Sequence, residues 1–234
     1  MIQHVYERAM ASGAEEVIVA TDDERVVKTV EGFGGQVCLT RREHLSGTDR
    51  IEEVAASQGW ADETIIVNLQ GDEPTMPPPL LDQVAQLLED HPEAAIATLC
   101  VPIDRVEELF DPNVVKVVRD RAGRALLFSR APIPWDRDTL AKDPPQLSAT
   151  VGALRHIGLY AYRAAFLHRY VSWEPCPLER AESLEQLRAL WHGETVFVEA
   201  ACVAPGHGVD TEADLAAAEA ALRRSDPGRE GFRV

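Results

Sequence analysis

Short apolar runs alternate with amphipathic stretches along the first hundred residues. Four runs are rich in β-branched residues and almost continuously apolar, at residues 16–20, 36–39, 64–69 and 95–101. Continuous apolar character is typical of strands that are buried on both faces, and the helices that join such strands make right-handed crossovers. Helical stretches separate the four runs. The pattern therefore predicts an α/β fold with a mainly parallel sheet.

The pattern changes after residue 113. The turn Ala122-Gly123 lies between two apolar runs and predicts an antiparallel hairpin, which a proline-rich stretch follows. In chain order we expect hairpin strands at 114–120 and 124–130, a strand at 156–162, a helix at 178–191, a strand at 195–203 and a helix at 211–223. This organisation predicts an α/β half at 1–112, an antiparallel region at 113–176, C-terminal helices at 177–224 that complete the main domain, and a flexible tail at 225–234.

The composition is that of a globular protein, and the charge argues against a nucleic-acid partner. Hydrophobic residues make up 45% of the 234 residues and charged residues 26%, which argues against a disordered or collagen-like chain. The 23 Lys and Arg residues against 39 Asp and Glu residues give a net charge of −16. Such a chain repels a polyanion, so we expect no nucleic-acid partner. The four cysteines lie far apart without a CxxC pair, which favours reduced thiols over a zinc site or a disulfide framework.

No segment of the sequence has the pattern of a membrane span or a signal peptide. The longest apolar stretch, residues 94–103, is well short of the ~20 residues that a bilayer requires. His4, Glu7 and Arg8 stand where a signal peptide is apolar. We therefore expect a cytoplasmic protein with no membrane partner.

The sharpest candidate for chemistry is the segment VNLQGDEP at residues 67–74, in which a buried strand ends in an acidic turn. Ligands of parallel α/β sheets bind beyond the carboxyl ends of the strands, so Asp72 is well placed to hold a cation. The Gln70 amide can both donate to and accept from a base or a ribose hydroxyl. The alternative is that Asp72 and Glu73 only shape a turn.

A second acid follows two glycines in PGHGVDTE at residues 205–212. Glycines let the backbone approach another segment closely before a helix begins. Magnesium usually takes one or two protein carboxylates and completes its shell with water and phosphate oxygens. If Asp72 and Asp210 lie close together beside a bound nucleotide, their two carboxylates would suit a magnesium ion. The alternative is that Asp210 and Thr211 only cap the last helix.

Several other segments have both a structural and a functional interpretation. Thr21-Asp22-Asp23 is expected to supply a helix N-cap. Ser46 and Asp49 form a predicted capping box, and a helix N-terminus with Arg50 one turn in also suits a phosphate or a nucleotide edge. Arg137 is flanked by acids, so it either pairs with them or clamps a carboxylate.

Three residues of the C-terminal half are weaker candidates by themselves. His156 begins a predicted strand, where a histidine is more often a packing residue than a ligand. Glu185 and Gln186 lie in a predicted helix whose leucines, at 184, 187 and 190, supply the apolar face. Simple exposure is the alternative for both.

Taken in order along residues 1–222, seven blocks resemble the bacterial 3-deoxy-manno-octulosonate (KDO) cytidylyltransferases. They are VATDDERV, SGTDR, VNLQGDEP, FSRAPIPWDRD, HIGLYAYR, PLE followed by LEQLRALW, and GHGVDTEADL. The resemblance implies a doubly wound, Rossmann-like nucleotidyltransferase fold with an added antiparallel region for sugar binding and dimerisation. It also implies a cytoplasmic homodimer that uses Mg²⁺ to join CTP and KDO, giving CMP-KDO for lipopolysaccharide and releasing pyrophosphate.

The resemblance also implies roles for individual residues. Asp72 and Asp210 are expected to be the catalytic magnesium ligands, with Arg137 at the KDO carboxylate. The expected nucleotide contacts are Ser46, Arg50 and Gln70, and the expected sugar-acid contacts are Arg137, His156, Glu185 and Gln186.

The family begins with a strand and a loop of the type R-x-x-S-x-R-L-P-G-K-P, whose Arg and Lys hold the CTP phosphates. The first residues of this sequence match positions just after that loop. We therefore expect two strand edges without partners, and a 234-residue chain that is unstable by itself. Two other functions stay open: a cytidylyltransferase for another sugar acid, such as sialic acid or an amino-substituted KDO, and a catalytically silent nucleotide-binding or dimerisation module.

Overall fold

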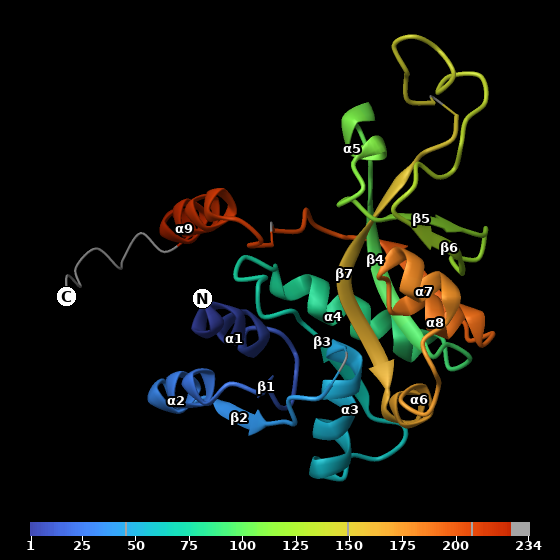
Figure 1. Ribbon diagram of the computed structural model, residues 1–234. Coiled ribbons are helices and arrows are strands. Elements are labelled where there is room, and N and C mark those ends of the chain that lie inside the picture. Colours follow the sequence, from blue (N-terminus) through green and yellow to red (C-terminus); the bar gives the residue numbers. More distant parts are fainter. Residues whose placement is uncertain (45, 149, 207, 226–234) are drawn as a thin grey trace. The chain divides into compact units, whose positions relative to one another are not determined.

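The computed structural model describes residues 1–44, 46–148, 150–206 and 208–225 (Figure 1). The chain forms two compact units, each assembled from segments that are separate in the sequence. The first unit comprises Met1–Leu39, Leu69–Asp82 and Cys202–Val234, and the second comprises Thr40–Asn68 and Gln83–Ala201. Most of the expected tail, at 226–234, lies outside the described residues. The expected functional regions stay a prediction.

The first unit contains a small parallel sheet with its helices. Helix α1 (Ile2–Met10) is amphipathic and buries Val5 and Ala9. Strands β1 (Ile18–Thr21) and β2 (Gln36–Leu39) pair in parallel across α2 (Glu24–Gly32). The N-cap of α2 is Asp23, whose side chain accepts from the Arg25 amide at 2.8 Å, so the expected cap is confirmed. The C-terminal helix of this unit is α9 (Glu212–Ser225).

The second unit is built on a mixed six-stranded sheet. Its order is β6-β5-β7-β4-β8, and β3 pairs with β7 off this path (Figure 1). The strands are β3 (Ile65–Asn68), β4 (Ile96–Pro102), β5 (Lys116–Arg119), β6 (Ala125–Ser129), β7 (Leu154–Arg163) and β8 (Val196–Ala200). The hairpin expected around Ala122-Gly123 is present as β5 and β6, with Gly123 at φ 91°.

The α/β class is confirmed, but the sheet is not mainly parallel in the part of the chain that the structure describes. Strand β4 pairs in parallel with β8, whereas β7 runs antiparallel to β3, β4 and β5. The cause is the position of β7, which lies between β3 and β4. Two of the four strands that were expected to lie in a mainly parallel sheet, β3 and β4, therefore each pair with an antiparallel neighbour.

Six helices lie between β2 and β8 in the sequence of the described chain. They are α3 (Gly47–Gln58), α4 (Pro78–Asp90), α5 (Val106–Phe110), α6 (Ala164–Tyr170), α7 (Pro177–Glu182) and α8 (Gln186–Trp191). The single helix expected at 178–191 is wrong, because it is divided into α7 and α8. Ser183 has φ 52° in the left-handed region, which ends α7.

Strand pairing leaves unpartnered edges. Among the described strands, β1 pairs only with β2, and β3 pairs only with β7. The expected instability of the chain stays a prediction.

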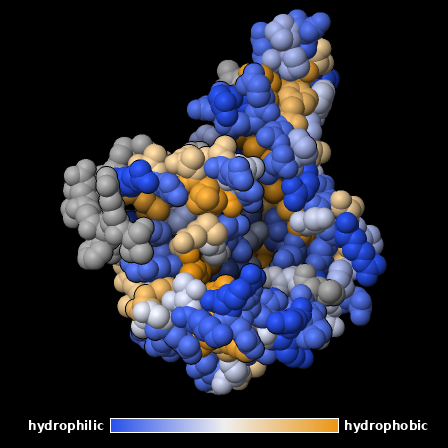
Figure 2. Space-filling model, turned by 60° about the vertical axis from the view of Figure 1, so that its left-hand side comes forward, coloured by the Kyte–Doolittle hydropathy of each residue, from blue (hydrophilic) through white to orange (hydrophobic). Residues whose placement is uncertain are grey.

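The surface is predominantly hydrophilic, with scattered apolar patches on the face drawn in Figure 2. This agrees with the excess of acidic side chains in the sequence. None of the helices within the described residues combines the length and the apolar character that a membrane crossing requires. No disulfide joins the four cysteines in the described part of the chain: Cys100 and Cys176 are buried, Cys38 is partly buried and Cys202 is exposed.

Candidate functional site

The acidic turn after β3 is formed by the backbone rather than by the Asp72 side chain. The Glu73 amide donates to the Gln70 carbonyl at 3.2 Å, and the Met76 amide donates to the Glu73 carbonyl at 3.3 Å. Neither bond uses the carboxylate of Asp72, which is partly exposed. The interpretation that Asp72 only shapes the turn therefore has no support from its side chain.

The second turn packs directly against the first. The Val209 amide donates to the Asp72 carbonyl at 2.9 Å. A Cβ at Gly208 would lie 3.1 Å from Glu73 Oε1, and a Cβ at Gly206 would lie 2.7 Å from the Thr75 carbonyl oxygen and closer still to its hydroxyl. The close approach expected of these glycines is confirmed, and the segment that they approach is the turn carrying Asp72. His207, between them, lies outside the described residues.

Asp210 does not cap α9. The Thr211 amide and hydroxyl donate to Asp214 Oδ2 at 2.9 and 2.7 Å, and the Asp214 amide donates to Thr211 Oγ1 at 3.2 Å. This reciprocal box satisfies the start of the helix without Asp210, which is exposed one residue earlier. The alternative that these residues cap the last helix is therefore confirmed for Thr211 and wrong for Asp210.

These two turns of the first unit fit a magnesium ion. No described residue forms a hydrogen bond or an ion pair with the carboxylate of Asp72 or Asp210. Within the described ranges, no group of three or more His, Cys, Asp and Glu side chains could hold a metal. A pair of carboxylates that leaves most of the coordination shell to water and phosphate oxygens is what Mg²⁺ commonly accepts. Gln70 lies in the same unit, two residues before Asp72.

In the second unit, α3 begins at the predicted capping residue. Ser46 is the N-cap, and its Oγ accepts from the Asp49 amide at 3.1 Å. Arg50 Nη1 donates to Thr40 Oγ1 and, at 3.4 Å, to the Arg41 carbonyl. The guanidinium therefore lies against the segment that follows β2. Leu45 lies outside the described residues.

The N-terminus of α3 is joined to the start of α8. Glu185 Oε2 accepts from the Thr48 hydroxyl at 2.6 Å and from the Thr48 amide at 3.3 Å. A carboxylate at this position interacts favourably with the positive end of the helix dipole. Glu185 is thus a partly buried structural acceptor rather than a simply exposed helix residue.

Gln186 is buried beside Glu185. Its side chain is only 6% exposed, and Nε2 has no hydrogen-bond partner among the described residues. A buried amide without an acceptor costs stability, so it is a candidate ligand contact. The alternative that the side chain is simply exposed is therefore wrong for Gln186, as it is for Glu185.

His156 lies on β7 in an aromatic cluster. Its ring centroid is 5.0 Å from that of Phe128 and 5.2 Å from that of Tyr160, which in turn stacks on Tyr162 at 5.7 Å. Burial lowers the pKa of His156 to about 3, so the ring is neutral near pH 7. Burial also raises the pKa of Tyr162, whose hydroxyl hydrogen-bonds to Thr48. A continuous set of contacts thus links His156 to Glu185 through two tyrosines and Thr48.

Arg137 pairs with a neighbouring acid, which was the structural alternative to its predicted role at a carboxylate. Its Nε lies 3.1 Å from Asp138 Oδ1, and its side chain is 90% exposed. The structure gives Arg137 no contact with the other predicted sugar-acid residues, and its role at a carboxylate stays a prediction.

The sequence did not single out Thr48 and Thr98. Thr98 is fully buried, and its hydroxyl contacts His156 Nε2 at 2.9 Å. The available signal was a lone hydroxyl residue inside the apolar strand IATLCV. For Thr48 the signal was a second hydroxyl within the SGTDR capping segment.

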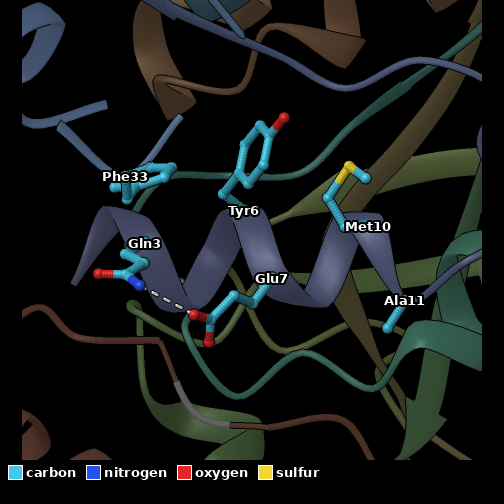
Figure 3. A pocket seen from close by; sticks show the side chains of 6 residues that line it. All are labelled: Gln3, Tyr6, Glu7, Met10, Ala11 and Phe33. Atoms are coloured by element: carbon cyan, nitrogen blue, oxygen red, sulfur yellow. Dashed lines mark hydrogen bonds between the residues drawn. The ribbon is translucent and has the colours of Figure 1, made fainter. Parts of the chain in front are cut away.

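A shallow hollow of about 310 Å³ lies beside α1 in the first unit (Figure 3). On its wall the rings of Tyr6 and Phe33 meet with centroids 5.4 Å apart, and Gln3 Nε2 donates to Glu7 Oε1 at 3.0 Å. It is lined by Gln3, Tyr6, Glu7, Met10, Ala11 and Phe33. No predicted site residue is among them, so we assign the hollow no catalytic part.

Comparison with known sequences gives a consistent family. A family model described as cytidylyltransferase matches residues 1–196. The 3-deoxy-manno-octulosonate cytidylyltransferase of Pseudomonas syringae pv. syringae (strain B728a) is 58% identical over 215 residues, which cover 92% of this chain and 85% of that protein. The protein of the same name from Thioalkalivibrio sulfidiphilus (strain HL-EbGR7) is 56% identical over 223 residues, covering 95% and 88%.

Solved structures give the same result. The structure of CMP:2-keto-3-deoxy-manno-octonic acid synthetase complexed with CTP matches with a TM-score of 0.85 and 42% identity, covering 96% of this chain and 88% of that one. The structure of 4-diphosphocytidyl-2C-methyl-D-erythritol synthase matches with a TM-score of 0.60 and 14% identity, covering 94% and 89%, which shows the fold alone. The chain belongs to the cytidylyltransferase family, as a member of its 3-deoxy-manno-octulosonate cytidylyltransferases.

Proposed function

We propose that this chain joins CTP to KDO, releasing pyrophosphate and forming CMP-KDO for lipopolysaccharide. The observation that carries the proposal is the hydrogen bond from the Val209 amide to the Asp72 carbonyl. It brings together two turns, 138 residues apart in the chain, whose aspartates have no competing partner among the described residues. The names of the relatives support CTP and KDO as the substrates.

The first unit is proposed to bind the metal and the nucleotide. Asp72 and Asp210 would hold Mg²⁺, and the Gln70 amide would contact the base or the ribose. When bound, magnesium neutralises phosphate charge and polarises the phosphoryl oxygens. Both substrates are anions and the chain carries a net charge of −16, so the aspartates serve catalysis only by binding a cation there.

The second unit is proposed to bind the sugar acid and to add nucleotide contacts. Ser46 and Arg50 stand at the start of α3. The Thr48–Glu185 hydrogen bonds connect that helix to Gln186, whose free Nε2 can donate to a sugar hydroxyl or carboxylate. Arg137 is proposed to pair with the carboxylate of KDO, exchanging its exposed contact with Asp138 for a charge-assisted one.

The proposed reaction is an in-line displacement at phosphorus. The anomeric hydroxyl oxygen of KDO forms a bond to the α-phosphorus of CTP as the bond from that phosphorus to the pyrophosphate oxygen breaks, and the hydroxyl proton passes to water. The side chains contribute by orienting the two substrates and by binding charge at the transferred phosphoryl group.

Pyrophosphate release tests this proposal. The full chain is incubated with CTP, Mg²⁺ and one of several sugar acids. We expect release with KDO, and Asp72→Asn and Asp210→Asn each to lower kcat by about 100-fold or more, since several kcal/mol of charge stabilisation are lost. Asp214→Asn is the matched control, because it removes one charge from the same segment but from the cap of α9.

The outcomes also separate the two alternatives. Release of pyrophosphate with sialic acid or an amino-substituted KDO, but not with KDO, contradicts the proposal that KDO is the substrate. Binding of CTP without release from any sugar acid favours a silent nucleotide-binding module. An Asp210→Asn variant with the activity of the unchanged chain contradicts the metal site.

We further propose that two copies of the chain associate through the antiparallel region. Leu126 on β6 is 61% exposed, and Trp135 is 56% exposed in an edge-to-face contact with Phe110. Large exposed apolar side chains are common in association surfaces. Light scattering should give the mass of a dimer for the chain and of a monomer for Leu126→Asp, with Leu215→Asp on α9 as the control. If the Leu126→Asp chain is still a dimer, the proposed association surface is contradicted.

The cytoplasmic location expected from the sequence stays a prediction.

A further inference from the structure

We infer that Thr98 is a positioning residue that fixes which ring nitrogen of His156 carries the proton, and so presents Nδ1 as an acceptor to a hydroxyl of the sugar acid. The inference deepens the proposed function and rests on it, because the acceptor acts only if His156 faces the sugar. Thr98 itself need not touch substrate.

An irregularity between β4 and β7 creates the arrangement. Leu99 is the partner of Ile157, whereas Thr98 is the partner of Tyr160. Gly158 and Leu159 therefore lie between two adjacent partners of β4, as in a β-bulge. At this point the Thr98 hydroxyl lies 3.1 Å from the Ile157 carbonyl oxygen and 2.8 Å from the Leu159 carbonyl oxygen.

Counting protons settles the direction of the contact with His156. A hydroxyl has one proton, and a carbonyl oxygen can only accept. Two carbonyl oxygens within hydrogen-bond distance take that proton, so the Thr98 oxygen turns a lone pair toward His156 Nε2 at 2.9 Å. Nε2 must then be the donor. The neutral ring carries its proton on Nε2, which leaves Nδ1 as an acceptor.

The environment of the ring agrees with this role. Phe128 and Tyr160 flank the ring and hold its plane. No group among the described residues hydrogen-bonds to Nδ1. An acceptor on a neutral ring suits a hydroxyl and disfavours a carboxylate. His156 is therefore assigned to the polyol part of the sugar acid. The carboxylate of the sugar acid is expected to pair with a cationic group instead.

The matched pair Thr98→Val and Thr98→Ser tests the inference, because valine keeps the shape without the hydroxyl and serine keeps the hydroxyl. Long-range ¹H–¹⁵N spectra of histidine-labelled full chain report the protonated nitrogen, and His156→Gln identifies the signal. We expect protonation at Nε2 in the unchanged chain and in Thr98→Ser, and a shift toward Nδ1 in Thr98→Val.

Kinetics provide the second readout. In Thr98→Val the KM for KDO should rise about 5- to 100-fold, the effect of leaving one buried polar group unpaired, while the KM for CTP is unchanged. Thr98→Ser should restore it to within about threefold. A loss of packing alone would change both KM values, or would not be rescued by serine.

Each contrary result has a distinct meaning. Protonation at Nδ1 in the unchanged chain overturns the inference even if Thr98→Val does not fold. A Thr98→Val chain that keeps both the Nε2 proton and its KM for KDO overturns it as well. If the unchanged chain shows the Nε2 proton but does not use KDO, the proposed function fails, and the link between Thr98 and the ring tautomer is upheld.

Discussion

At the scale of the residue, Lys116 shows how a buried cation is held in this fold. It is fully buried, and its Nζ donates to the carbonyls of Asp111, Val114 and Arg130 at 2.9, 2.6 and 2.5 Å. Burial lowers the pKa of the ammonium group, but its three donors are all used. The side chain thereby joins the segment before β5 to the residue after β6.

Lys116→Met should therefore be strongly destabilising. Methionine fills most of the space of the lysine stem but leaves three carbonyls without their donor. We expect the free energy of unfolding to fall by about 2–4 kcal/mol in urea denaturation. Lys142→Met, at an exposed position, should change it by less than about 0.5 kcal/mol. Equal effects of the two variants would show that the three bonds contribute little.

His156 should make the stability depend on pH. Its pKa in the folded chain is about 3, below the ordinary value of 6.5, so between these values the unfolded chain binds more protons. Stability contributed by the neutral ring is present above about pH 6.5 and is lost as the pH falls toward 3. From pH 7 to pH 5 we expect the free energy of unfolding of the unchanged chain to fall by about 1–2 kcal/mol more than that of the His156→Gln chain. His4→Gln, on α1, is the control, and parallel losses in all three chains would contradict the depressed pKa.

At the scale of the element, the start of α3 depends on a carboxylate from another helix. Ser46 supplies the local cap, and Glu185 accepts from the amide and the hydroxyl of Thr48. Glu185→Ala should lower the free energy of unfolding by about 1–2 kcal/mol, and Thr48→Val by about 1 kcal/mol. The two losses should not add in the double variant, because one interaction is removed twice. Full additivity would contradict the coupling, and Glu89→Ala on the surface of α4 serves as the control.

The elements themselves were largely predictable, and their partners were not. The buried run at 95–101 is β4, and the capping residues Asp23, Ser46 and Thr211 all begin helices as expected. The insertion of β7 between β3 and β4 was missed, because an apolar run records that a strand is buried but not which strand lies beside it. The break at Ser183 was missed because serine carries no helix-breaking signal comparable to Gly or Pro.

The site was predictable to the same extent. The glycines before Asp210 predicted a close backbone approach, which the structure shows against the turn that carries Asp72, whereas the role of the two aspartates stays a prediction. Hydroxyl contacts across the sheet, such as Thr98 with His156, depend on a register shift that no local pattern encodes.

At the scale of the whole molecule, the two units differ in how their strands are supported. Strand β4 pairs with β7 on one edge and β8 on the other, and Ala97, Leu99 and Cys100 are fully buried. Strand β1 pairs only with β2 among the described strands, and most of its residues are partly exposed. A two-stranded sheet has little stability of its own.

Hydrogen exchange should therefore distinguish the units. Amides of β4 should exchange only on global unfolding, whereas those of β1 and β2 should exchange through smaller openings, at least about tenfold faster, since each 1.4 kcal/mol of opening free energy is a factor of ten. Mass spectrometry of peptides that cover 16–39 and 95–102 measures both in one sample. Adding CTP with Mg²⁺ should slow exchange in the first unit if Asp72 and Asp210 bind the metal there, and Asp210→Asn should abolish that protection. Equal exchange of β1 and β4 in the absence of ligand would show that the two units unfold as one, and that the pairing of β1 with β2 is not the weaker part of the molecule.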